Sequence, residues 1–368
     1  MAMQPSSSAL IACAMIAFGA LPVAPAAADA VADAKAAVAK YAGPQTTWEG
    51  PTKGPKPEAG KKIVFLSGDE QNDISHLYGV YIKQAGQKLG WDVTVIDGKG
   101  SPTSWLAGMN QAIALKPDGI ALFADAASLQ DPLKAGVAQG IKFVGLHAAG
   151  LPGPQPDLHL VVNIQEDPRE IGKAEADWAI ADSNGKAHVV VLSHNEYAIA
   201  KVKSMATKDE IEKCPDCKVL DYVNSPASEA AQRQPQLTTS WVQRFGLPIY
   251  ATSVGDNDWD FAVPTLRSGG VDPAQAKLIG ADGNRSAYDR IRKGDQYQAV
   301  TVSEPIELQA WQAIDELNRA FNNEPPSGFV QPPFLVTKEN INAEGGDKNT
   351  FIPSNNYKQH YLDVWAVK

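Results

Sequence analysis

The sequence predicts an α/β protein in which parallel β-sheets are covered by helices on both faces. From residue 61 onward, short apolar or β-branched runs alternate with segments whose apolar residues recur at helical spacing, a pattern typical of parallel sheets. The 368 residues are 44% hydrophobic and 20% charged. The chain can therefore bury a large core, and its length favours two domains over one.

The predicted elements alternate along most of the chain. Strands are expected at residues 63–66, 93–97, 119–123, 143–147, 159–162, 188–193, 219–223, 249–253, 278–281, 299–303 and 334–337. Helices are expected at residues 77–89, 102–115, 129–139, 168–181, 198–212, 259–266 and 306–321. Before them, residues 29–60 are predicted to form an Ala-rich helix and a Pro/Gly-rich linker outside the main domains.

The first 28 residues have the pattern of a secretory signal peptide. An apolar segment is followed by the small residues of 24–28, which favour cleavage after Ala28, although no Lys or Arg precedes the segment. The alternatives are a membrane anchor, which Pro22 and Pro25 make too short to span a bilayer, and lipidation of Cys13, which lies inside the apolar run instead of after it. We therefore expect export to the periplasm.

Two cysteines remain after this segment, Cys214 and Cys217 in KCPDCKV. In an oxidising compartment such a pair is expected to form a local disulfide. A redox CxxC would need the pair at a helix N-terminus, whereas here it follows a helical pattern and precedes a strand. A single CxxC is also at most half of a zinc site.

The composition and motifs exclude several classes of function. A net charge of −9 argues against nucleic acid as a partner, because phosphate binding needs clustered Lys and Arg. The first strand is followed by SGDEQND instead of GxGxxG, and no GxSxG is present. The six histidines are scattered and form no HxH or HxxH pair, so we expect no metal and no cofactor.

Polar residues gather where the predicted strands end. In residues 277–305, one strand ends at Asp282-Gly283 and the next at Ser303-Glu304. A helix is expected between them: Ser286 would be its N-cap, Asp289 would lie in its first turn, and Gly294 would end it. Ligands bind outside the carboxyl ends of parallel strands. Carboxylates and amides suit a ligand rich in hydroxyl groups.

Four segments, in this order, resemble the type I periplasmic binding proteins, in particular the ribose-binding-protein-like sugar receptors of ABC transporters. KKIVFLSGD with LYGVYIKQAGQKLGWDVTVIDG resembles the first strand, helix and second strand of that family, and KPDGIALFADAASL resembles its third strand and ligand loop. GDNDWDFAVPTLRSGG resembles its Asn-Asp motif at the head of a helix, and LIGADGNRSAYDRIRKGDQYQAVTVSEPIELQAWQAIDEL its closing segment. The resemblance covers roughly residues 61–340.

The resemblance implies two Rossmann-like lobes with parallel sheets, joined by a hinge of three crossings. The first lobe would comprise residues 61–147 and 304–329, and the second lobe 148–303 and 330–345, followed by a tail at 346–368. One crossing would lie at Ser303-Glu304 and another near His147 to Gly150. Lobes of this kind close on a ligand by hinge motion.

The resemblance also implies a function: a periplasmic receptor that passes a monosaccharide or polyol to an ABC permease, with a chemoreceptor as a further partner. We expect a monomer that is not an enzyme. The residues expected to contact the ligand, some by resemblance and some by their place at strand ends, are Asp69, Asn72, Asp73, Tyr78, Asp125, His147, Tyr197, Lys201, Asn257, Asp258, Trp259, Asp282, Ser303 and Glu304.

Several of these residues have a structural interpretation as well. Asn257 or Asp258 could cap a helix, Trp259 could belong to the core, and His147 could be a hinge residue. Lys201 stands closest to a position where the family often has arginine, and it could equally be a solvated charge. An acidic first loop and Trp259 argue against ribose itself.

The sequence is compatible with two other functions. The chain could be a receptor for a small cationic or aromatic ligand, since the many carboxylates near Trp259 and Tyr78 could hold a cation by charge and cation–π contact. Asp282 and Glu304 could be the two carboxylates of a glycosidase, although nothing in the sequence sets their separation.

Overall fold

The computed structural model describes Met1 and residues 26–367. The predicted signal peptide falls almost entirely outside these residues, and the first described helix, α1 (Ala26–Tyr41), overlaps its last three positions. Among the described residues no helix is both long and apolar enough to cross a membrane.

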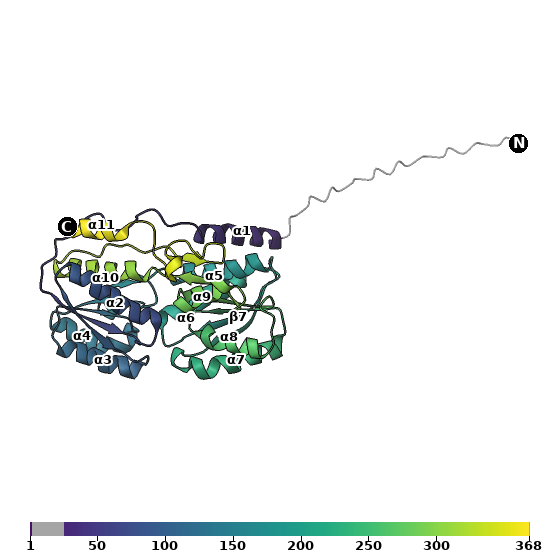
Figure 1. The fold of residues 1–368 in the computed structure, drawn as a ribbon, viewed down its shortest axis with the longest axis horizontal. Coiled ribbons are helices and arrows are strands. Elements are labelled where there is room, and N and C mark those ends of the chain that lie inside the picture. The colour runs from purple at the N-terminus through teal and green to yellow at the C-terminus, as the bar shows by residue number, and fades with distance from the viewer. Residues whose placement is uncertain (2–25, 368) are drawn as a thin grey trace.

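Two lobes lie side by side, each built on a six-stranded sheet (Figure 1). The first sheet has the order β2 (Asp92–Asp97), β1 (Lys62–Ser67), β3 (Gly119–Leu122), β4 (Lys142–Leu146), β6 (Leu160–Ile164), β5 (Gly153–Gln155). All neighbours are parallel except β5 and β6. Helices α2 (Asp73–Lys88) and α10 (Ile306–Phe321) cover one face, and α3 (Pro102–Ala114) and α4 (Gln130–Ala138) the other.

The second sheet repeats this plan. Its order is β8 (Lys218–Asn224), β7 (His188–Ser193), β9 (Ile249–Ser253), β10 (Ala276–Asp282), β11 (Gln298–Ser303), β12 (Phe334–Val336), and only β12 is antiparallel to its neighbour. Helices α5 (Pro168–Asp182) and α6 (Ala198–Ile211) pack together, as do α7 (Ala230–Phe245) and α8 (Asp258–Ser268), while α9 (Arg285–Lys293) packs on β11. The predicted two-lobed α/β fold is confirmed.

Strand pairing corrects the predicted lobe boundary. Residues 148–164 were expected in the second lobe, but β6 pairs with β4 and β5 pairs with β6, so both belong to the first sheet. The first crossing therefore follows Ile164, and the turn at His147 to Gly150 stays within the first lobe. The chain crosses a second time at Glu304 and a third time between α10 and β12.

Smaller corrections concern single elements. The N-cap of α9 is Asn284 instead of Ser286, and Asp289 lies beyond the first turn. Gly294 ends the helix with φ of 76°, a left-handed conformation that glycine adopts without the steric cost of a Cβ. Helix α7, strand β5 and the C-terminal helix α11 (Tyr357–Val364) were not predicted. The disulfide between Cys214 and Cys217 is present.

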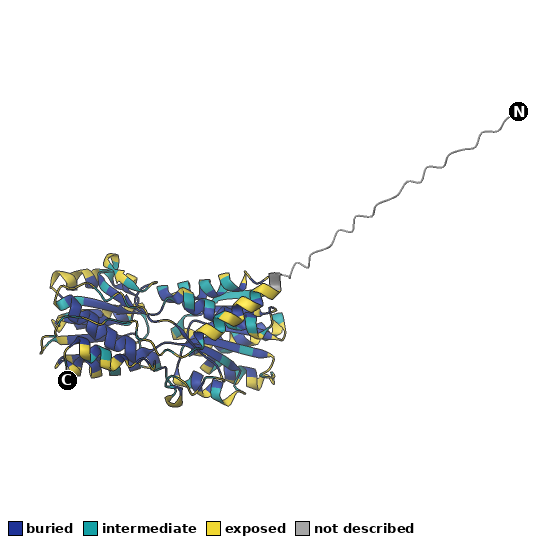
Figure 2. Ribbon diagram, turned by 90° about the horizontal axis from the view of Figure 1, so that it is seen from above, coloured by how far each residue is buried: buried dark blue, intermediate teal, exposed yellow. Residues whose placement is uncertain are grey.

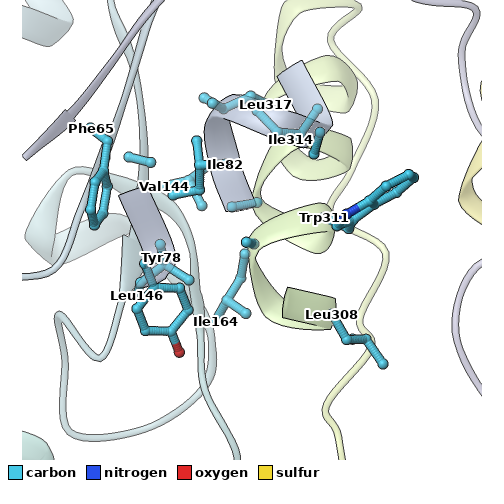
Figure 3. Close-up of a cluster of buried hydrophobic side chains, with 14 of the residues drawn as sticks. Phe65, Tyr78, Ile82, Val144, Leu146, Ile164, Leu308, Trp311, Ile314 and Leu317 are labelled. Atoms are coloured by element: carbon cyan, nitrogen blue, oxygen red, sulfur yellow. The ribbon is translucent and has the colours of Figure 1, made fainter. Parts of the chain in front are cut away.

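Apolar side chains between sheet and helices hold each lobe together. Figure 2 shows buried residues concentrated on the strands and on the inner faces of the helices. In the first lobe, residues of α2 and α10 interlock over the sheet (Figure 3). Each fully buried side chain of this size stabilises the fold by about 1.5–3 kcal/mol relative to exposure. The cluster includes Phe65, Tyr78, Ile82, Val144, Leu146, Ile164, Leu308, Trp311, Ile314 and Leu317.

The chain ends add two further connections between the lobes. Helix α1 packs on α5 of the second lobe, where the Tyr41 hydroxyl donates to Glu170 (2.6 Å). Residues 42–60 then run to the first lobe, where the Trp48 ring stacks on His360 with centroids 5.0 Å apart. At the other end, α11 packs on α10, with Trp365 Nε1 donating to Asp315 (2.8 Å). Both helices lie along the same side of the molecule (Figure 1).

Candidate binding cleft

A cavity lies between the lobes at the carboxyl ends of the strands. Its larger part, which we call the outer chamber, measures about 470 Å³ and takes its walls from both lobes. A smaller part, the inner chamber, measures about 70 Å³ and reaches toward the hinge. The residues that line both chambers are Asn72, Phe123, Tyr197, Ala227 and Asn257.

The loop after β1 presents two carboxylates to the outer chamber. Asn72 caps α2 by accepting a hydrogen bond from the Ser75 amide (3.0 Å). The Ser75 hydroxyl in turn accepts from the amides of Gly68 (2.9 Å) and Asp69 (3.2 Å). Because these bonds fix the loop backbone, Asp69 and Asp73 are held at the cavity wall.

A buried lysine occupies the wall of the inner chamber. The Lys203 ammonium group, on α6, donates to Asp282 Oδ1 (3.1 Å) and to the Val254 carbonyl (3.0 Å). Its side chain is only 3% exposed. Asp282 ends β10 with φ of 84°, and His147 follows β4 with φ of 54°. These left-handed conformations are uncommon for residues other than glycine and are often found at functional sites.

The lysine belongs to a polar network that runs through the hinge. Glu304, at the second crossing, lies with Oε2 2.6 Å from His147 Nε2 and accepts from Gln309 Nε2 (3.1 Å), while its Oε1 is 4.0 Å from Lys203 Nζ. Burial alone would raise the pKa of Glu304, but its contacts with His147, Lys203 and Gln309 hold that pKa below its usual value. The pKa of Lys203 is raised, because the neighbouring carboxylates outweigh the desolvation of the ammonium group. Glu304 and Lys203 are therefore both ionised.

A second buried carboxylate shapes the turn after β10. Asp256 accepts hydrogen bonds from the amides of Gly283 (2.9 Å) and Asn284 (3.0 Å) and from the Thr301 hydroxyl (2.8 Å). Burial raises the pKa of Asp256 to about 7, although Arg290 and these hydrogen bonds oppose the shift. Asp256 therefore holds in place the turn that carries Asn284 to the outer chamber.

The structure brings half of the expected ligand contacts to the cavity. They are Asp69, Asn72, Asp73, His147, Tyr197, Asn257 and Asp282. Tyr197 is supported from behind by the buried Trp105, with ring centroids 5.1 Å apart. The Asn257 side chain makes no capping hydrogen bond to α8, so its amide is available to a ligand.

The other expected contacts lie away from the cavity surface. Trp259 has no exposed area and donates from Nε1 to the Ile279 carbonyl (3.1 Å), which makes it a core residue. Asp258 is equally buried and accepts from Ser253 (2.5 Å), with His194 Nε2 at 3.0 Å.

Tyr78, Ser303 and Glu304 lie beneath the cavity wall. Tyr78 donates to Gln309, Ser303 accepts from the Tyr288 hydroxyl (3.1 Å), and Glu304 belongs to the hinge network.

Two further expected contacts, Asp125 and Lys201, line neither chamber. Asp125 accepts a hydrogen bond from the Ala198 amide (3.1 Å) and so joins the lobes at the edge of the cleft. Lys201 is exposed to solvent, and the lysine at the chamber is Lys203. The burial of Lys203 could have been inferred from the sequence. Lys203 follows Ile199 by four residues and Ala200 by three, so it falls on the buried stripe of α6.

Other lining residues were not anticipated from the sequence. They include Phe123, His194, Phe261, Asn284 and Arg285. Phe123 follows β3 directly, so the rule that places ligands at strand ends could have identified it. Among the described residues no group of three or more His, Cys, Asp or Glu side chains is arranged to hold a metal ion.

The chain is similar to known proteins both in sequence and in fold. The family described as "Periplasmic binding protein domain" matches residues 63–325. A sugar ABC transporter structure from Yersinia enterocolitica is 18% identical with a TM-score of 0.69, covering 86% of this chain and 99% of that one. A myo-inositol binding protein from Caulobacter is 20% identical, with a TM-score of 0.67 and coverages of 78% and 96%.

A further similar structure is an ABC transporter solute binding protein from Agrobacterium vitis with bound allitol. It is 18% identical with a TM-score of 0.66, covering 77% of this chain and 97% of that one. No curated protein sequence matches this chain significantly. At these identities the structural likenesses show the fold.

Proposed function

The chain belongs to the periplasmic binding protein family, and we propose that it is the receptor of an ABC importer for a sugar or polyol. The observation that carries the proposal is the cavity between the lobes, where carboxylates and amides stand beside aromatic rings. Structures similar to this one have been solved with allitol and with myo-inositol. Both are small and polyhydroxylated.

The polar groups in the cavity match the chemistry of hydroxyl groups. Asp69 and Asp282 can each accept hydrogen bonds from two hydroxyls, and Asn72 and Asn257 can both donate and accept. Phe123 and Tyr197 offer ring faces to the C–H groups of a sugar. Because the two lobes supply these groups together, a bound ligand stabilises the closed arrangement.

Contacts between the lobes already exist at the rim of the cavity. The Ala198 amide donates to Asp125 (3.1 Å) and the Arg285 amide to Asp73 (3.4 Å). Each contact joins a backbone amide of one lobe to a carboxylate of the other. The permease, or a chemoreceptor, would recognise the closed arrangement that these contacts and the ligand favour.

The cation-binding alternative is disfavoured by the inner chamber. Asp282 is already paired with the Lys203 ammonium group, so a cationic ligand would have to displace it or approach it against like charge. The glycosidase alternative is disfavoured by the same contacts. Asp282 is paired with Lys203, and Glu304 is buried and engaged by His147 and Gln309. Neither of these two carboxylates is therefore free to act as an acid or base. We therefore propose binding without turnover.

The proposal includes export and a monomeric state. The signal peptide predicted over residues 1–28 would place the mature chain in the periplasm, where the disulfide between Cys214 and Cys217 is stable. A monomer that closes on its ligand is sufficient for delivery to a permease.

A thermal-shift screen of the mature protein tests the proposal. The probes are pentoses, hexoses, allitol, myo-inositol and, for the alternative, choline. A ligand at 100 times its Kd stabilises the folded state by about 2.7 kcal/mol, which gives a measurable rise in Tm. A shift with choline that disappears at high salt, without a shift from any sugar or polyol, would favour the cation receptor instead.

A matched pair of variants locates the site. Asp282→Ala should weaken binding of the best probe by about 1.5–3 kcal/mol, because hydrogen bonds to a charged acceptor are lost. Asp92→Ala is the control, since Asp92 is exposed at the amino end of β2, away from the cleft. Equal affinity in both variants, measured by calorimetry, would contradict this placement of the ligand.

A further inference from the structure

The cleft is larger than one sugar ring requires, even with the lobes in contact. The hydrogen bonds from Ala198 to Asp125 and from Arg285 to Asp73 join the lobes. The outer chamber nevertheless measures about 470 Å³. Cavities of roughly 300–1,000 Å³ hold drug-sized ligands, and a single hexose is smaller than these. The inner chamber, about 70 Å³, has room only for the polar edge of a ring.

The junction of the two chambers is built for one ring. Phe123 and Tyr197 line both chambers, and Asp282 and His147 lie at the inner end. Both aromatic residues are held in place by neighbours. The Tyr197 ring packs against Trp105. The centroids of the Phe123 and His147 rings are 5.1 Å apart.

The outer chamber has an aromatic wall and unused polar groups of its own. Phe261, on α8, is half-buried at this wall and belongs to none of the hydrophobic cores of the described residues. Asn284 is 5% exposed, and its Oδ1 has no hydrogen-bond partner within the described part of the chain. A buried acceptor without a partner is costly, and a ligand hydroxyl would remove that cost.

Arg285 adds a donor at the same wall. Its side chain is 58% exposed, and the guanidinium Nη1 lies 3.9 Å from Asp73 Oδ1, too far for a hydrogen bond. The group is therefore free to turn toward a ligand. Asn284 and Arg285 are adjacent at the start of α9, on the turn that Asp256 fixes.

From these two sets of groups we infer that the ligand has two rings and is a disaccharide or a glycoside. One ring lies between Phe123 and Tyr197 with its polar edge toward Asp282. The second ring lies in the outer chamber against Phe261, where Asn284 accepts and Arg285 donates hydrogen bonds. The inference rests on the proposed sugar-binding function and specifies its substrate class.

Calorimetry with matched sugars tests the inference. The probes are maltose, lactose, sucrose and trehalose, each compared with its constituent monosaccharides, on the mature wild-type protein. At least one disaccharide should bind ten-fold or more tightly than either of its constituents. Phe261→Ala should weaken that disaccharide at least ten-fold and leave monosaccharide affinity within two-fold, whereas Asp282→Ala should weaken both.

Two further variants complete the design. Asn284→Ala should act as Phe261→Ala does. Phe245→Ala is the control, because Phe245 is a half-buried aromatic residue on α7 that packs against the hydrophobic core and lines neither chamber. Circular dichroism of every variant shows that the fold is retained.

The outcomes separate this inference from the function on which it rests. Monosaccharides that bind as tightly as every disaccharide would overturn the two-ring ligand and leave the sugar receptor standing. A disaccharide that binds Phe261→Ala and Asn284→Ala as it binds wild type would overturn the placement of the second ring. If neither group of sugars binds, the sugar-receptor proposal fails and the two-ring inference with it.

Discussion

The two lobes share the order of their first four strands but place different side chains at equivalent strand ends. Read from β2 and from β8, the second, first, third and fourth strands of each lobe lie side by side, and each sheet ends in one antiparallel strand, which precedes its neighbour in the chain in the first lobe and follows it in the second. At the end of the fourth strand along the chain of each lobe, the first lobe has His147 and the second has Asp282, both with positive φ. At the next crossing the first lobe has Glu166 and the second has Glu304.

The two hinge glutamates differ although their positions correspond. Glu304 is engaged by His147 and Gln309, and its pKa is lowered. Both oxygens of Glu166 lack a hydrogen-bond partner among the described residues. Burial and the neighbouring Glu304 carboxylate raise the pKa of Glu166 well above its usual value, and Lys203 only partly opposes this. One carboxyl group is therefore ionised and the other favours the protonated form.

The charges around the hinge are asymmetric, although the two lobes repeat one fold. Lys203, in the second lobe, is the only buried lysine among residues 26–367. Its single positive charge lies near the carboxylates of Asp282, Glu304 and Glu175. Because one cation cannot neutralise every carboxyl group around it, some of them remain protonated.

Replacing the lysine should have the largest effect. In Lys203→Met, the buried Glu304 and the partly buried Asp282 lose their cation, which should lower the free energy of unfolding by about 3–5 kcal/mol. Lys201→Met is the control, because Lys201 is exposed two residues earlier on the same helix, and its effect should stay within about 0.5 kcal/mol. Urea unfolding measures both. Similar losses in the two variants would contradict the special role of Lys203.

The sequence predicted those features that depend on local patterns. Helix α10 was expected at residues 306–321 and spans Ile306–Phe321, because its apolar spacing lies within one segment. Asn257 and Asp282 were expected at the cleft by the rule that ligands bind at the carboxyl ends of strands, and both line the inner chamber. The local disulfide between Cys214 and Cys217 follows from spacing and compartment alone.

Features that depend on distant partners could not be predicted. Lys203 is buried because Asp282, 79 residues further along the chain, pairs with it, whereas a sequence pattern treats a helical lysine as solvated. The first crossing was placed too early because β6 joins β4 only through tertiary pairing. Trp259 could face the ligand or the core, and its indole hydrogen bond to Ile279 belongs to the folded state.

The two hinge glutamates offer a sharper test of the comparison. Glu304→Gln removes the charge that His147 and Lys203 contact, which should cost about 1.5–3 kcal/mol of unfolding free energy at pH 7. Glu166→Gln replaces a carboxyl group that favours its neutral form, so stability should change by less than about 0.5 kcal/mol. Urea unfolding at pH 7 decides between them. Equal losses would show that the two positions are electrostatically equivalent after all.

The smallest expected effect concerns Glu175, the third carboxyl group near Lys203. Burial raises the pKa of Glu175 to about 8, while Lys203 and a hydrogen bond from the Thr207 hydroxyl (2.8 Å) oppose the shift. An acid with a raised folded-state pKa holds its proton in the folded state and releases it when unfolded, so stability falls as pH rises from about 4.5 to 8.

Glu175→Gln should remove this pH dependence and keep the hydrogen bond, because the Gln carbonyl can accept from Thr207. Relative to wild type, the variant should gain up to about 1.4 kcal/mol of unfolding free energy between pH 6 and pH 7. Urea unfolding at the two pH values measures the gain. Glu212→Gln, on the exposed end of α6, is the control and should show no such trend. If the unfolding free energies of wild type, Glu175→Gln and Glu212→Gln change by the same amount over this interval, Glu175 is ionised in the folded protein and the prediction is wrong.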